Sequence, residues 1–239
     1  MSKLINYPYI NGNQISVSEK SIFLNSQFVH PDTDPKWNAP FIWELEVIQA
    51  FVDRIEDNDV ILDIGSNSGT FSLAAKYYPT TQWHSFEPDP FNFSLLEENL
   101  KLNGIENVVS YEDALSDKVG EDILKICPSH HGLNTLGKNL ERFSENDSID
   151  HPVKTNTIDN LFLDTKIDLI KMDTEGSEYD IIVGGKETIK KYKPIILLEY
   201  NAGNMSQCGH NMQELNDLFN ELNYTPCLTM GENLFIQSR

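Results

Sequence analysis

A glycine-containing turn follows the first short apolar run that has the character of a buried strand. The run is Val60-Ile61-Leu62, and the turn reads Asp63-Ile64-Gly65-Ser66-Asn67-Ser68-Gly69. Glycines let the backbone come close to a ligand, and a helix that begins after the turn offers free N–H groups. The turn lacks the third glycine of a dinucleotide site and the lysine of a P-loop. Asp63, two residues before Gly65, suits instead a cofactor that carries a cationic amino-acid group.

Two more acidic positions follow the next two predicted strands. Glu87 ends the run 82–86, where its carboxylate can accept hydrogen bonds from both hydroxyls of a ribose. Asp113 and Ala114 come just after the run 107–111, where they are placed to contact the edge of an adenine. Three such matches at successive strand ends predict a site for S-adenosylmethionine (SAM). The residues predicted to bind it are Asp63, Gly65, Ser66, Asn67, Gly69, Glu87, Asp113 and Ala114.

Polar side chains also follow the fourth and fifth predicted strands. Asp173 and Glu175 come after the run 167–172, and Glu199 and Asn201 stand at the end of the run 194–200. Ligands of open α/β sheets bind beyond the C-terminal ends of the strands, so the methyl acceptor is expected here. Methyl transfer requires a group that takes the proton of the acceptor. In a first mechanism, Asp173 or Glu175 is this base, with a pKa raised by its carboxylate neighbours.

A second mechanism uses a metal ion. Asp173, Glu199 and Asn201 offer oxygen ligands to Mg²⁺ or another divalent cation, a layout similar to that of catechol-type O-methyltransferases. Lys171 then deprotonates the acceptor, or it pairs with a nearby carboxylate. The sequence leaves both mechanisms open.

Strands and helices alternate around these positions. Helical spacing over 39–55 precedes the first strand, and helices are predicted over 71–78, 88–102, 178–192 and 212–222. The segment 115–156 is less regular and is expected to hold two strands around a loop, and the tail from Tyr224 offers two more short strands. This alternation predicts a doubly wound α/β domain with a parallel sheet and helices on both faces. Residues 1–40 are predicted to form an N-terminal cap, and 41–239 the main domain.

The composition restricts the partners and the compartment. A net charge of −19 makes nucleic acid an unlikely substrate, because its phosphates would be repelled. The one dense basic cluster, Lys186, Lys190, Lys191 and Lys193, fits the solvated end of a helix. Three cysteines without a paired spacing, the lack of a signal peptide and the lack of a membrane span predict a cytoplasmic protein.

Four segments together resemble the FkbM family of methyltransferases. They are Leu62 to Gly69, Phe86-Glu87-Pro88-Asp89-Pro90, Thr157-Ile158-Asp159-Asn160-Leu161 and the run Asp168 to Glu178. The resemblance covers roughly residues 58–202. It implies the seven-stranded fold of SAM-dependent methyltransferases and transfer to a hydroxyl oxygen. Members of the family act on hydroxyls of sugars, polyketides and other small or glycan-linked acceptors.

The leading hypothesis is O-methylation of a carbohydrate hydroxyl, on a glycan terminus or a deoxyhexose such as rhamnose. The alternatives are a polyketide or other small-molecule hydroxyl, a non-catalytic SAM-binding module, and a nucleotide-dependent oxidoreductase, which the missing third glycine disfavours. Secondary candidates for the site are His130, His131, Asn134 and His210, and Tyr7, Tyr9, Trp37 and Trp43 for stacking on a sugar ring.

Overall fold

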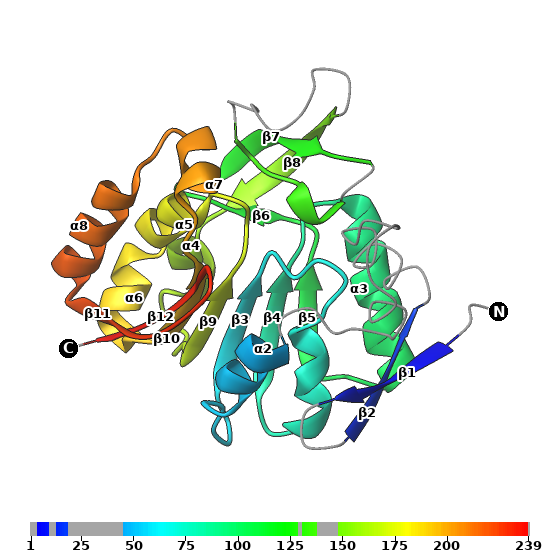
Figure 1. The fold of residues 1–239 in the computed structure, drawn as a ribbon. Helices are drawn as coiled ribbons and strands as arrows, with labels where there is room; N and C mark the ends of the chain where they lie inside the picture. The colour runs from blue at the N-terminus through cyan, green and yellow to red at the C-terminus, as the bar shows by residue number, and fades with distance from the viewer. Residues whose placement is uncertain (1–3, 10–12, 19–44, 129–130, 138–147, 239) are drawn as a thin grey trace.

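A seven-stranded sheet forms the centre of the protein (Figure 1). The computed structural model describes residues 4–9, 13–18, 45–128, 131–137 and 148–238. The strands, in spatial order, are β11 (Tyr224–Met230), β12 (Asn233–Ser238), β10 (Ile195–Glu199), β9 (Leu169–Met172), β3 (Val60–Ile64), β4 (Gln82–Phe86) and β5 (Val108–Tyr111). The neighbours from β10 to β5 run parallel, and β12 is antiparallel to both β10 and β11. The predicted doubly wound, mostly parallel sheet is confirmed.

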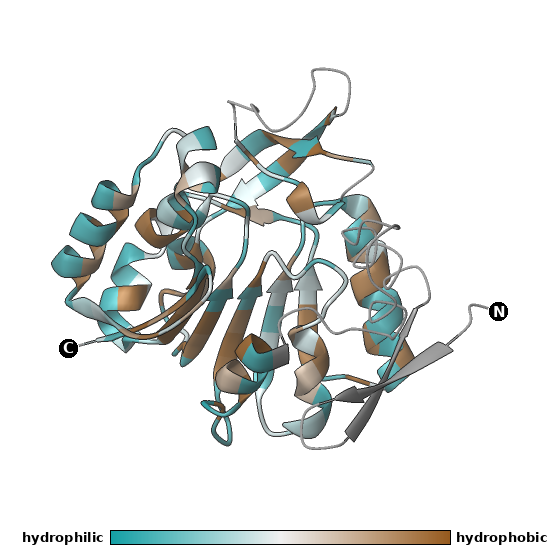
Figure 2. Cartoon of the chain, in the orientation of Figure 1, coloured by the Kyte–Doolittle hydropathy of each residue, from teal (hydrophilic) through white to brown (hydrophobic). Residues whose placement is uncertain are grey.

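Helices cover both faces of the sheet because successive side chains of its strands point to opposite faces. Ile61, Trp83 and Leu169 pack on one face, and Leu62, Ile170 and Ile196 on the other. The first face is covered by α2 (Leu45–Val52), the 3-10 helix η3 (Ser72–Tyr77) and α3 (Pro90–Asn103). The second is covered by α4 (Ile158–Phe162), α5 (Glu178–Gly184), α6 (Lys186–Tyr192), α7 (Ala202–Gln207) and α8 (Met212–Leu222). Apolar residues accordingly concentrate in the strands between these layers (Figure 2).

Two predicted helices take a different form. The helix predicted over 178–192 is interrupted at Gly185, which separates α5 from α6. A Cβ on Gly184, the last residue of α5, would lie 2.1 Å from the carbonyl oxygen of Ser116, so only glycine fits this position. The helix predicted over 71–78 is η3, in which Ala74 N donates to Phe71 O and Tyr78 N to Ala75 O. These three-residue steps make it a 3-10 helix.

A second, smaller sheet lies beyond the C-terminal ends of the central strands (Figure 1). It holds β6 (Ala114–Leu115), β8 (Ile149–Asn156) and β7 (Gly120–Ile126) in that order, with β7 and β8 antiparallel. A short 3-10 turn, η4 (His131–Leu133), follows β7, and Thr135 then bridges back to Lys125. The two strands predicted in this irregular middle region are therefore present.

The N-terminal region contains a hairpin of β1 (Leu4–Tyr9) and β2 (Asn13–Ser18), and β2 lies against α3 (Figure 1). The rest of the predicted cap lies outside the described residues, as do residues 39–44 of the helix predicted before β3. The division into a cap and a main domain stays a prediction.

Among the helices that the structure describes, none combines the length and the apolar character needed to cross a bilayer.

Candidate active site

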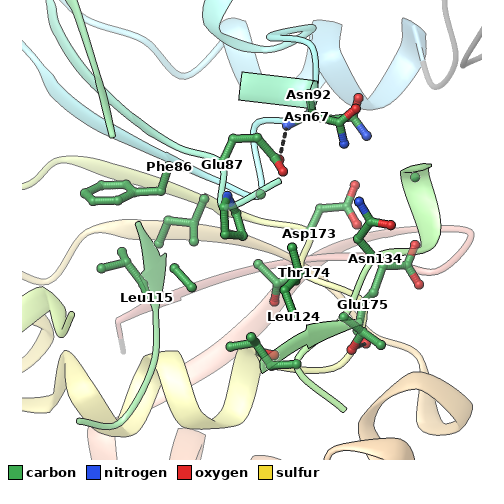
Figure 3. A pocket seen from close by; sticks show the side chains of 18 of the residues that line it. Asn67, Phe86, Glu87, Asn92, Leu115, Leu124, Asn134, Asp173, Thr174 and Glu175 are labelled. Carbon is green, nitrogen blue, oxygen red and sulfur yellow. Dashed lines mark hydrogen bonds between the residues drawn. The ribbon is translucent and has the colours of Figure 1, made fainter. Parts of the chain in front are cut away.

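A pocket of about 630 Å³, part of it open to solvent, lies at the C-terminal ends of β3, β4 and β9 (Figure 3). One end is largely apolar and the other end carries amides and carboxylates. The apolar end is lined by Ile64, Phe86, Pro88, Ala114 and Leu115, and Leu124 and Leu136 also line the pocket. The polar lining includes Asn67, Asn92, Asn134, Asp173 and Glu175. The predicted residues Gly65, Asn67, Glu87, Asp113, Ala114, Asp173 and Glu175 all line this pocket.

The glycine turn forms one wall of the pocket. Gly65 N and Ser66 N both donate to Phe86 O, at 3.0 and 2.9 Å, and this fixes the turn against the end of β4. Gly65 has a φ of +71°, and a Cβ there would lie 1.9 Å from the carbonyl oxygen of Asp173. Only glycine allows this close approach, which brings the turn next to the chain that follows β9.

Asp63 lies beneath the turn and not on the surface of the pocket. Its side chain is 0% exposed, and the Lys171 ammonium lies 3.3 Å from its Oδ1. Ser72 Oγ donates to its Oδ2 at 2.5 Å. Lys171 also donates to Gly65 O at 2.7 Å, and its side chain is 5% exposed. Asp63 and Lys171 are therefore brought together, as one of the two sequence interpretations of Lys171 required.

Glu87 is buried at the boundary between the two ends of the pocket. Asn67 N donates to its Oε2 at 2.8 Å and Asp89 N donates to its Oε1 at 2.9 Å. Each carboxylate oxygen keeps a further lone pair for a ligand hydroxyl. Burial raises the pKa of Glu87 to about 7, although the two backbone donors lower it.

Three carboxylates meet beside the polar end, and two of them, Asp173 and Glu175, line the pocket. One oxygen each of Asp173, Glu175 and Glu199 lies within 4.8 Å of the others. Asn204 Nδ2 donates to Glu175 Oε2 at 2.8 Å and to both oxygens of Glu199 at 3.0 Å. Burial and the repulsion from Asp173, Glu175 and the buried Glu178 raise the pKa of Glu199 to about 9. Like charges held this close are expected to share a proton or a cation.

Asn201 has a local role beside this cluster. Its Oδ1 accepts from Gly203 N at 2.9 Å and from Asn204 N at 3.1 Å, which makes it the N-cap of α7. Glu175, and not Asn201, is the third oxygen donor that the fold gathers with Asp173 and Glu199. Glu175 has a φ of +57°, so a reversal of the backbone that the sequence pattern does not reveal turns its carboxylate toward Glu199.

A second group, which the sequence analysis did not assemble, fastens the segment after β7 over the pocket. The buried Asp89 caps α3 by accepting from Phe91 N, and its Oδ2 lies 2.7 Å from His131 Nδ1. Asn134 Nδ2 donates to the same oxygen at 2.8 Å. Asn92 Nδ2 donates to His131 O at 3.1 Å. The Asp-Pro pair at residues 89 and 90 is a sequence signal for the start of a helix at Asp89. Nothing in the sequence indicates that Asp89 contacts residues 131 and 134.

Other secondary candidates lie elsewhere. His210 Nε2 lies 2.8 Å from Asp180 Oδ1, and its ring lies against Tyr179, among residues that do not line the pocket. Tyr7 and Tyr9 lie in β1, and His130, Trp37 and Trp43 lie outside the described residues. In the basic cluster, Lys186 lies 2.6 Å from Glu221 and Lys191 lies 3.2 Å from Asp164, so neighbouring carboxylates balance these lysines.

The model of the Methyltransferase FkbM domain matches residues 63–226, which is more than half of the chain. The protein belongs to the FkbM methyltransferase family. Its fold is that of the class I SAM-dependent methyltransferases, and the chain is a SAM-dependent methyltransferase.

The FkbM assignment agrees with individual relatives. The 2-O-methyltransferase NoeI of Sinorhizobium fredii is 32% identical over 174 residues, covering 66% of this chain and 70% of that protein. The hexuronic acid methyltransferase AglP of Haloferax volcanii is 24% identical over 164 residues, covering 67% and 63%. The crystal structure of a methyltransferase FkbM from Methylobacillus flagellatus has a similar fold, with a TM-score of 0.53 and 17% identity over 79% of this chain. The match spans 46% of that crystallised chain.

Proposed function

We propose that this FkbM-family protein transfers the methyl group of SAM to a hydroxyl oxygen of a sugar or glycan terminus. The observation that carries the proposal is the carboxylate cluster at the polar end of the pocket, adjacent to the cofactor turn. Two relatives, the 2-O-methyltransferase NoeI and the hexuronic acid methyltransferase AglP, support oxygen as the acceptor atom and a sugar as the acceptor class.

The cofactor occupies the apolar end in this proposal. Phe86, Ala114 and Leu115 would hold the adenine, Asp113 would contact its edge, and Glu87 would accept hydrogen bonds from the ribose hydroxyls. Gly65 and Asn67 would hold the methionine part. The buried Asp63 acts on this part through the turn that it underlies.

Asp173 is the general base in this mechanism. It is the most exposed of the three carboxylates, it lines the pocket, and its carbonyl group packs against Gly65. The hydroxyl oxygen forms a bond to the methyl carbon while the bond from carbon to sulfur breaks, and S-adenosylhomocysteine (SAH) leaves. Asp173 accepts the hydroxyl proton. Glu175 and Glu199, held by Asn204, orient the acceptor hydroxyls. Lys171 has no role as a base here, because its ammonium is buried against Asp63 and Gly65 O.

A divalent cation is a second candidate for handling that proton. Three carboxylates whose oxygens lie within 4.8 Å form a hard, negatively charged donor set, so Mg²⁺ or a similar ion fits the residues present. Asp173, Glu175 and Glu199 would hold it. When bound, such an ion would lower the pKa of the acceptor hydroxyl.

Mass spectrometry tests the function. The protein would be incubated with methyl-labelled SAM and a panel of neutral sugars, deoxyhexoses, glycan termini and small-molecule alcohols. We expect one labelled methyl group on a sugar oxygen, and label only on non-sugar acceptors would overturn the sugar assignment. A parallel series with a chelator, then with added Mg²⁺, separates the two mechanisms: turnover that resists the chelator supports Asp173 acting alone.

A cytoplasmic location is part of the proposal. It rests on Cys127, Cys208 and Cys227, which lie in the described part of the chain and form no disulfide there.

A further inference from the structure

Lys171 lies at the centre of a buried polar group under the cofactor turn. In the sheet register it is the direct neighbour of Asp63, on the adjacent parallel strand. Its ammonium contacts Asp63 Oδ1 at 3.3 Å, donates to Gly65 O at 2.7 Å, and lies 5.2 Å from the centre of the Phe71 ring. Asp63 Oδ2 accepts from Ser72, which in turn lies 2.7 Å from Ser85 Oγ.

Stability alone is a weak reason for this pair. Taking two charges out of water costs about as much as their attraction returns, and apolar residues of similar volume usually stabilise a core equally well. What an apolar side chain cannot do at position 171 is donate to the carbonyl oxygen of Gly65. That carbonyl belongs to the residue at which the chain leaves β3 and turns, with a φ of +71°, toward the ligand.

The position of Gly65 in turn determines the shape of the pocket on two sides. Its own N–H and that of Ser66 are fixed to Phe86 O, and Asn67 N reaches Glu87 from the same turn. On the other side, the backbone of Gly65 packs against Asp173 O, two residues beyond Lys171. Lys171 therefore ties the cofactor turn to the strand that carries the proposed base.

We propose that Lys171 is a positioning residue for the cofactor turn. Its hydrogen bond to Gly65 O holds the turn in the geometry that binds SAM, and Asp63 is the counter-charge beside its ammonium inside the core. The inference rests on SAM binding at this turn and not on the identity of the acceptor.

Three variants test it, with SAH as the probe in isothermal titration calorimetry. They are Lys171→Met, the double variant Asp63→Asn/Lys171→Met, and the surface control Lys186→Met. We expect the double variant to melt near the wild-type temperature, because no unpaired charge is left in the core. Its Kd for SAH should nevertheless rise about 10- to 100-fold, the range for losing one hydrogen bond from a charged donor. Lys186→Met should bind SAH as the wild type does.

A double variant that is folded and binds SAH with wild-type affinity would overturn the proposal, since the pair would then be structural only. If Lys171→Met fails to fold, the double variant still decides the question. Because SAH binding needs no acceptor, a failure of the sugar assignment leaves this test intact, and a change in SAH affinity leaves the sugar assignment open.

Discussion

Two groups of charged side chains meet at β9 and the turn after it, where β3 contributes Asp63 to one group and β10 contributes Glu199 to the other, and they are built in opposite ways. Lys171 and Asp63 are oppositely charged, almost fully buried and paired. Asp173, Glu175 and Glu199 carry the same charge, are partly exposed and are held within 4.8 Å of one another. The charges of the first group are balanced within the protein. The second requires a proton, a cation or a ligand to relieve its repulsion.

This contrast distinguishes charged residues that fix the backbone from charged residues that can react with a substrate. A buried charge that is paired with an opposite charge is suited to fix backbone geometry. In the repelling cluster at the edge of the pocket, burial and neighbouring carboxylates raise the pKa of Glu199, and such a group can exchange a proton with a substrate. Neighbouring positions on one strand thus serve different purposes because one side chain points under the glycine turn and the other into the pocket.

The variant Asp173→Asn tests most directly whether the carboxylate cluster performs the chemistry. If the open cluster performs the chemistry, kcat should fall about 100- to 10,000-fold while SAH binding stays near the wild-type value. Label transfer from SAM measures the first and calorimetry the second. The matched control is Asp217→Asn on the exposed face of α8. Unchanged turnover in Asp173→Asn would remove this residue from the mechanism.

The pair of Lys171 and Asp63 is tested by its effect on the stability of the protein. Lys171→Met leaves the Asp63 carboxylate buried without its counter-charge, and we expect the free energy of unfolding to fall by about 3–5 kcal/mol. Adding Asp63→Asn should recover most of the loss. Urea denaturation measures both variants, and Lys186→Met, which removes a surface lysine paired with Glu221, serves as the control. A single variant as stable as the wild type would show that the pair is dispensable.

The cluster of Asp173, Glu175 and Glu199 can also be tested by changing the charge of the methyl acceptor. Among the described residues that line the pocket there is no lysine or arginine, whereas Asp173 and Glu175 both line it. In chelated buffer, a neutral hexose should therefore be methylated with a kcat/KM at least about tenfold higher than the matching uronic acid, because like charges repel. Preference for the uronic acid under these conditions would contradict this description of the polar end.

The smallest expected effect concerns Glu87, whose pKa burial raises from 4.5 to about 7. Ionisation strengthens it as an acceptor for the ribose hydroxyls, so the affinity for SAH should rise severalfold between about pH 6 and about pH 8. In the ligand-free protein the native state keeps a proton that the unfolded chain releases. The stability contribution of Glu87 is thus full below the unfolded pKa and is lost as the pH rises through about 7. Calorimetry and thermal melts should show both trends weakened in Glu87→Gln, and unaltered trends would assign them to another group.

Much of the architecture followed from local patterns. The helix α8 coincides with the predicted segment 212–222, and its capping box, in which Asn211 and Glu214 bond to each other's backbone, is a local signal. The helix α3 ends at Gly104 with a φ of +63°, as the Asn-Gly pair indicated. The break between α5 and α6 was not predicted, and the close packing of Gly184 against the backbone of Ser116, far away in the sequence, leaves no local signal.

By itself, the sequence determined the alternation of strands and helices, the glycine turn, and the acidic residue at each strand end, because these depend on spacing along one chain. Tertiary structure decided which of those acids face the ligand. It buried Asp63 against Lys171, made Asn201 a helix cap, and turned Glu175 toward Glu199 through a left-handed residue. Side-chain direction at a strand end depends on the neighbouring strand and on the first bend of the following loop. Residue spacing alone predicts neither the neighbouring strand nor this bend.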